Sequence, residues 1–86
     1  MRYEMPGLSI DDRGRLICVV SYTERTAIRT LTQAGWRRIE ENGMKGVVLC
    51  KAPFTRVDIE LVLQLLPDVR LWRNVREYLR RNTAQG

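Results

Sequence analysis

The residues of this chain whose type and spacing could do chemistry are arginines near its C-terminus. Five of the fifteen basic residues lie after Val69, with Glu77 as the one acid among them. They are Arg70, Arg73, Arg76, Arg80 and Arg81. On the helix that we predict over 68–81, these residues share one side. Guanidinium groups bind phosphates and carboxylates bidentately, so such a row is typical of a surface that binds nucleic acid or an acidic protein. A solvated helix face is the alternative.

A second basic group lies on or beside a predicted hairpin. It consists of Arg37, Arg38, Lys45 and Lys51. A hairpin that carries such side chains can follow the phosphates of a nucleic acid. Trp36 precedes the two arginines and could stack on a base or wedge into a junction. Its alternative role is to close the core directly after Gly35 ends the preceding helix.

The excess positive charge is concentrated in the last segment. From Val69 onward the net charge is +4, whereas the whole chain has +5 and a pI of about 9.9. Such a surface favours phosphates, acidic protein surfaces or anionic headgroups as partners. Arg outnumbers Lys by thirteen to two, a bias that phosphate binding and a source genome rich in G and C explain equally well.

Patterns of catalytic and metal-binding residues are missing from the sequence. Without a histidine, the chain lacks the commonest general base and every Ser-His or Cys-His nucleophilic pair. Asp11 and Asp12 lie at a predicted turn, and Glu40 and Glu41 would point to opposite faces of a strand. The two cysteines form no CxxC pair. We therefore expect no enzyme activity, no catalytic residue, no metal site and no cofactor.

The cysteines and the apolar runs indicate the compartment. Cys18 and Cys50 lie in apolar strand-like runs, where we expect reduced core thiols; a disulfide between neighbouring strands is the alternative. No apolar run reaches the roughly 18 residues of a membrane-spanning helix, and the N-terminus lacks the apolar region of a signal peptide. The sequence predicts a cytoplasmic protein with no membrane partner.

The predicted fold is a small α+β domain of element order ββαββαα, in which an antiparallel or mixed sheet carries its helices on one face. The predicted strands are 8–10, 15–22, 36–41 and 47–52, the last two joined through Asn42-Gly43. The predicted helices are 24–34, 56–66 and 68–81. Residues 1–86 form one domain, with an ordered core over about 8–81 and tails at 1–7 and 82–86.

Particular residues define the expected element boundaries. The uninterrupted apolar run of the second strand favours a central strand covered on both faces. Ser21 or Thr23 is the expected cap of the first helix, and Asp68 is the expected cap of the third. Thr55 and Asp58 have the spacing of a capping box at the start of the second helix.

The side of the last predicted helix opposite its arginines is apolar. Its residues are Leu71, Trp72, Val75, Tyr78 and Leu79. We expect this stripe to pack on the core of its own chain or to be covered by a partner, including a second copy in a homodimer.

Residues 14–66 contain a strand ending in Val20-Ser21-Tyr22, a helix bearing Ile28 and Leu31, the Trp36-Arg37-Arg38 hairpin arm and the helix of Leu61 to Leu66. In these pieces the segment resembles the HARP-like module of DNA annealing helicases and related remodellers. The chain differs from the family in lacking an aromatic residue in the second hairpin strand and any motor motif. The resemblance implies a DNA-binding accessory of a helicase that recognises branched or distorted duplexes.

Two functions are consistent with these features. The first is a small, basic, non-enzymatic module that binds nucleic acid, with DNA favoured, through its hairpin and its Arg-rich helix. The second is a protein-interaction factor, such as a phage-type inhibitor or adaptor. It would dock its Arg-rich helix on an acidic or nucleic-acid-binding surface of a host complex.

Overall fold

A mixed five-stranded sheet organises the fold in the computed structural model, which describes residues 6–39 and 46–83. The strands are β1 (Gly7–Ile10), β2 (Leu16–Val20), β3 (Arg37–Ile39), β4 (Val47–Lys51) and β5 (Arg70–Leu71), in the spatial order β3-β4-β2-β1-β5. The helices are α1 (Arg25–Gln33), α2 (Arg56–Leu65) and α3 (Arg73–Thr83). The prediction of a small α+β domain is confirmed.

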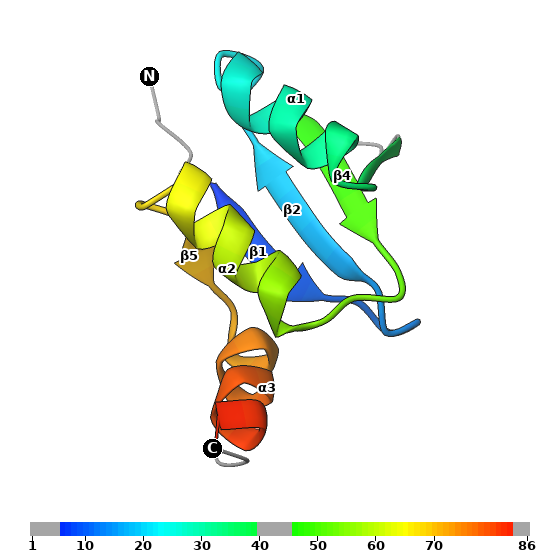
Figure 1. Ribbon diagram of the computed structural model, residues 1–86, viewed down its shortest axis with the longest axis vertical. Coiled ribbons are helices and arrows are strands. Elements are labelled where there is room, and N and C mark those ends of the chain that lie inside the picture. The colour runs from blue at the N-terminus through cyan, green and yellow to red at the C-terminus, as the bar shows by residue number, and fades with distance from the viewer. Residues whose placement is uncertain (1–5, 40–45, 84–86) are drawn as a thin grey trace.

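The core lies between the sheet and two of its helices. α1 and α2 cover one face of the sheet, and α3 lies beyond the end of β1 and β5 (Figure 1). Leu16, Cys18 and Val20 of β2 are buried towards the helices, whereas Ile17 and Val19 alternate with them and are half-buried on the other face. The expected central position of this strand is confirmed. Its expected burial on both faces is confirmed for the face that α1 and α2 cover, whereas on the other face Ile17 and Val19 are only half-buried.

The start of α2 follows from a local sequence signal. Thr55 Oγ1 accepts a hydrogen bond from Val57 N at 3.2 Å, and the Asp58 carboxylate accepts one from Thr55 N at 2.9 Å. Both halves of the predicted capping box are present, so backbone donors that a helix start leaves without partners are satisfied.

The start of α1 differs from the prediction. Glu24 occupies the N-cap position without a side-chain hydrogen bond, and neither Ser21 nor Thr23 caps the helix. The two hydroxyls instead contact each other at 3.0 Å, and Glu24 N donates to the Ser21 carbonyl at 3.1 Å. The turn that results presents Tyr22 to solvent, with 64% of its surface exposed. Gly35 ends α1 as predicted, with a φ of +100° that residues with a Cβ rarely adopt.

The segment before α3 departs most from the prediction. Arg70 and Leu71 form β5, which pairs in parallel with the first two residues of β1. The N–H groups of Arg70 and Trp72 donate to backbone carbonyls beside and within β1, at 2.7 and 3.0 Å. Because these groups bond to β1, the helix begins at Arg73 and Asp68 is not its cap. The element order is therefore ββαββαβα.

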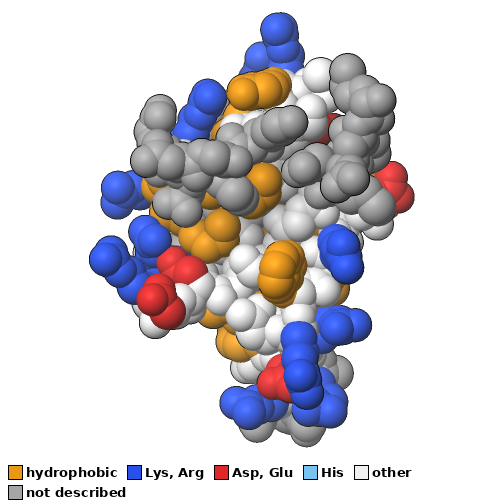
Figure 2. Space-filling view, turned by 180° about the vertical axis from the view of Figure 1, so that it is seen from behind, with side chains coloured by type: hydrophobic (Ala, Val, Ile, Leu, Met, Phe, Trp, Pro, Cys, Tyr) orange, Lys and Arg blue, Asp and Glu red, His pale blue; other side chains and the backbone are white. Residues whose placement is uncertain are grey.

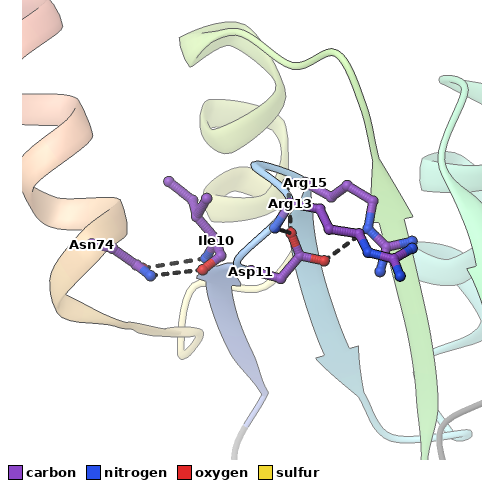
Figure 3. Close-up of polar contacts among 5 residues, drawn as sticks. All are labelled: Ile10, Asp11, Arg13, Arg15 and Asn74. Carbon is purple, nitrogen blue, oxygen red and sulfur yellow. Dashed lines mark hydrogen bonds and ion pairs between the residues drawn. The ribbon is translucent and has the colours of Figure 1, made fainter.

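Polar and apolar contacts together attach α3 to the rest of the domain. The side-chain amide of Asn74 accepts from Ile10 N at 3.2 Å and donates to Ile10 O at 2.7 Å, as a neighbouring strand would (Figure 3). Val75 has no exposed surface, and Tyr78 packs its ring against that of Phe54, with centroids 5.0 Å apart. These contacts determine which side of α3 faces the core.

The two cysteines are free, buried thiols. Cys50 lies opposite Ile17 in the register of β2 and β4, one position away from Cys18, so the two thiols point to opposite faces of the sheet. Burial raises the pKa of the Cys18 thiol to about 12. The prediction of reduced core thiols is confirmed, and the alternative of a disulfide is wrong.

Some expectations fall outside the described residues, and others shift at the chain ends. The first group comprises the Asn42-Gly43 turn, Glu40, Glu41 and Lys45. Gly7 belongs to β1 and Asn82 to α3, so the regular elements extend past the predicted core of 8–81 at both ends.

Candidate nucleic-acid interface

α3 displays arginines on the side opposite its core contacts. Arg73, Arg76 and Arg80, the α3 arginine row, line a shallow groove of about 290 Å³ together with Glu77. Figure 2 shows Lys and Arg side chains gathered at this end of the molecule. Arg73 Nε lies 3.5 Å from the Glu77 carboxylate, but the Arg73 side chain is 87% exposed, where ion pairs contribute little to stability. The row thus presents guanidinium donors to solvent.

Two predicted members of this basic surface lie apart from the row. Arg70 is in β5, and its register partner Gly7 lies opposite Val19, which places Arg70 on the sheet face without α1 and α2. Arg81 is exposed on α3 but does not line the groove. The prediction that all five arginines share one helix face is wrong for Arg70, because β5 replaces the first predicted turn of that helix.

The hairpin does not form one basic surface. Arg37 and Arg38 are successive strand residues and point to opposite faces of the sheet. Lys51 Nζ lies 3.4 Å from the Asp58 carboxylate and donates to Pro53 O at 3.2 Å, so it links β4 to the start of α2. Arg37, Arg38 and Lys51 therefore do not lie together on one surface, and their role in binding stays a prediction.

Trp36 is a core residue. Its side chain is 3% exposed, and its backbone N–H donates to the Leu31 carbonyl at 3.0 Å, directly after the end of α1. Its indole Nε1 has no hydrogen-bond partner among the residues that the structure describes, an arrangement that costs about 1–3 kcal/mol. The prediction that Trp36 stacks on a base is wrong in this conformation, and its alternative role in the core is confirmed.

A second groove, which was not predicted, lies between α1 and β3. It has a volume of about 460 Å³ and is lined by Tyr22, Arg25, Ile28, Arg29, Thr32, Arg38 and Val47; we call it the α1–β3 groove. Arg25 and Arg29 are one turn apart on α1, and Arg38 faces them from β3. None of these three arginines forms an ion pair with a carboxylate within the described part of the chain.

The α1–β3 groove combines charge with an apolar floor. Val47 is 2% exposed and belongs to the core, and Ile28 is half-buried against it. Tyr22 stands exposed at the rim. The Thr32 hydroxyl donates back to carbonyls of its own helix, so it adds little as a donor. The sequence signal was the pair of arginines at i and i+4 without an acid in α1, but only the tertiary fold places Arg38 beside them.

The predicted apolar stripe is only partly used by the core. Val75 is buried, and Leu71, Tyr78 and Leu79 pack against the core, which confirms the prediction for four of its five members. Trp72 is 60% exposed, because it precedes the helix instead of lying within it. The homodimer stays a prediction, for which Trp72 is the exposed member of the stripe.

The described residues contain neither a cluster of metal-ligating side chains nor a membrane-spanning helix. No group of three or more metal-ligating side chains lies close together in the ranges 6–39 and 46–83. No helix in these ranges is long and apolar enough to cross a membrane.

Comparison with known proteins finds no family model, no curated protein and no solved structure that matches the chain. The resemblance to the HARP-like module therefore stays a prediction.

Proposed function

We propose that the protein binds nucleic acid, with the α3 arginine row against the phosphate backbone. The supporting observation is the division of α3 into a side that holds the core through Val75 and a side that presents Arg73, Arg76 and Arg80 to solvent. Guanidinium forks match phosphate oxygens, and the net charge of +5 attracts a polyanion from a distance.

Such contacts determine position and affinity more than sequence preference. Phosphates are the same at every step, so binding through the α3 arginine row should depend steeply on salt and weakly on base sequence. The resemblance of residues 14–66 to a DNA-binding helicase accessory makes branched or distorted duplex DNA the first ligand to test. Arg81, which is exposed on the same helix, would add a further phosphate contact.

Salt-dependent binding of forked and fully paired DNA tests this function. In fluorescence anisotropy, the double variant Arg76→Gln/Arg80→Gln should bind more weakly, with a log–log salt slope reduced by about 0.9 for each lost phosphate contact. Arg56→Gln is a control because its guanidinium pairs with Glu60 at 3.2 Å on α2 and does not line the groove of the row. It should leave the slope unchanged. No binding of either DNA at about 50 mM salt would contradict the proposal.

A second function, as a protein-interaction factor, is favoured by Trp72. Its indole lies against Gly7, on the sheet face that also carries Arg70 and the half-buried Ile17 and Val19. Exposed Trp and Arg residues contribute most of the binding energy in many interfaces. The protein would then be an inhibitor or adaptor that docks this face and α3 on an acidic or nucleic-acid-binding surface of a host complex.

Affinity purification with and without nuclease separates the two functions. A stoichiometric protein partner that survives nuclease and is lost with Trp72→Ala would support the second. Recovery of nucleic acid alone, unchanged by Trp72→Ala, would support the first and contradict the second. Val57→Ala is the matched control, since Val57 is 68% exposed on α2 and has no part in the proposed face.

A further inference from the structure

We infer that the α1–β3 groove binds an unpaired base and its flanking phosphates in single-stranded nucleic acid. Tyr22 would stack on the base, and Arg25, Arg29 and Arg38 would hold the phosphates. This inference rests on the proposed function and gives it a second site, at the other end of the molecule from the α3 arginine row (Figure 1).

The charges in the groove favour an anion. Arg25 and Arg29 lie at i and i+4 on α1, where like charges repel each other. Arg25 is the first residue of α1, where the helix start carries partial positive charge, and α1 contains no acidic residue. Glu24 is the nearest acid along the chain, but it occupies the N-cap position and does not line the groove. A bound phosphate would relieve the repulsion.

The apolar part of the groove favours a base over a simple anion. Tyr22 is held outward by the Ser21–Glu24 turn, so its ring is placed before any ligand arrives. Ile28 and Val47 contribute apolar lining to the same groove. Every base has a π-face that stacks on an aromatic ring, and a volume of about 460 Å³ is within the usual range of small-ligand sites.

The strand must be unpaired because duplex bases hide their faces within the stack. Only single-stranded loops, ends and displaced strands offer a base that an exposed aromatic side chain can cover. Among the described residues, the groove of the α3 arginine row is lined by Arg73, Arg76, Glu77 and Arg80 alone, which suits phosphates better than a base. The two sites therefore differ in the ligand that each can recognise.

Binding of three ligands, each used as a fluorescent probe or as a competitor, tests this inference. They are an oligothymidine of about 15 nucleotides, an abasic phosphodiester strand of the same length, and poly-glutamate. Tyr22→Ala should weaken oligothymidine binding about tenfold and leave the abasic strand unchanged, since one stacked base contributes about that factor. Tyr22→Phe keeps the ring and should bind as the parent protein does. Arg25→Gln/Arg29→Gln should weaken both strands, with a reduced salt slope. Circular dichroism of each variant checks that it is folded.

Each outcome has a distinct meaning. Equal binding of oligothymidine by Tyr22→Ala and the parent protein would overturn the inference. If Arg76→Gln/Arg80→Gln still weakened duplex binding in that case, the proposed function would stand. Poly-glutamate that binds more tightly than oligothymidine and depends on Tyr22 would overturn the inference in favour of a protein ligand. Absence of binding to any nucleic acid would remove both proposals.

Discussion

The two basic ends of this molecule are built in different ways. The α1–β3 groove is assembled from a turn, a helix and two strands, and α1 packs on the core through the buried Ala27 and Leu31. The α3 arginine row lies on one helix beyond the sheet, attached through Asn74, Val75 and the apolar residues that follow. Similar charge can thus be placed on an integral part of a fold or on its periphery.

Because the two basic ends are attached to the core differently, we expect them to differ in how readily they open. Segments with fewer buried contacts open locally at lower free energy than the core does. Among the described residues, α3 has one buried side chain, Val75, whereas α1 has two, Ala27 and Leu31. On this ground we expect α3 to open without global unfolding, whereas the α1–β3 groove should be lost only when the sheet itself unfolds. The predictions below test this difference, beginning with the largest expected effect.

Leu31→Ala should lower the free energy of unfolding by about 3 kcal/mol. Leu31 has no exposed surface and joins α1 to the core, so its truncation leaves a cavity beneath the groove. Urea unfolding followed by circular dichroism measures the loss. Thr26→Ala, at an exposed position of the same helix, is the control and should change stability by less than about 0.5 kcal/mol. A Leu31→Ala effect as small as that of the control would show that α1 is not integral to the core.

Alkaline pH should destabilise both ends together, because Cys18 lies in the central strand β2. Burial disfavours the thiolate, so the folded thiol has a pKa of about 12 against an ordinary 9.0. The unfolded chain releases its proton first, and stability falls as pH rises from about 9 to 12, by about 1.4 kcal/mol per pH unit. Urea unfolding at pH 8 and pH 10 should show this loss, about 1.4 kcal/mol in total.

Cys18→Ala is the control for the alkaline effect. The variant starts from a lower stability, but it lacks the thiol and should lose less stability between the same two pH values. An identical pH dependence in the two proteins would contradict the assignment to Cys18.

Asn74→Ala should release α3 while α1 stays protected. The substitution leaves the N–H and C=O of Ile10 without their side-chain partner, at a cost of about 1 kcal/mol for groups that water can partly reach. Hydrogen exchange should accelerate in 73–83 and remain unchanged in 25–33. Asn74→Asp keeps the acceptor for Ile10 N but loses the donor to Ile10 O, so it should have an intermediate effect. Equal acceleration in both helices would show one cooperative unit.

Local signals made much of the fold predictable. The Thr55–Asp58 capping box and the Gly35 helix end act within a few residues, and both were found from the sequence. β5 was not found, because Leu71 and Trp72 fit a helical period. What decides their conformation is pairing with a β1 segment about sixty residues earlier in the chain.

The candidate sites likewise divide into one that local sequence predicts and one that depends on contacts between distant segments. The α3 arginine row was predictable, since Arg73, Arg76 and Arg80 share a side by helical spacing alone. The α1–β3 groove was not, because it needs Arg38 of β3 beside two arginines of α1, and Tyr22 exposed by the turn before them. Arg37 and Lys51 were grouped because both lie on or beside the predicted hairpin, but strand alternation and the Asp58 contact separate them.

Removing a single charge at each end should change stability in opposite directions. Arg25→Gln relieves repulsion with Arg29 and should stabilise the protein by a few tenths of a kcal/mol. Glu77→Gln removes the one acid on the α3 face and should destabilise it by a similar amount. Urea midpoints at low salt measure both changes, and about 1 M salt should reduce them, since screening weakens exposed charge interactions. Destabilisation by Arg25→Gln would mean that Arg25 supports the fold. The arginines of the α1–β3 groove would then not be a cluster whose mutual repulsion persists until an anion binds.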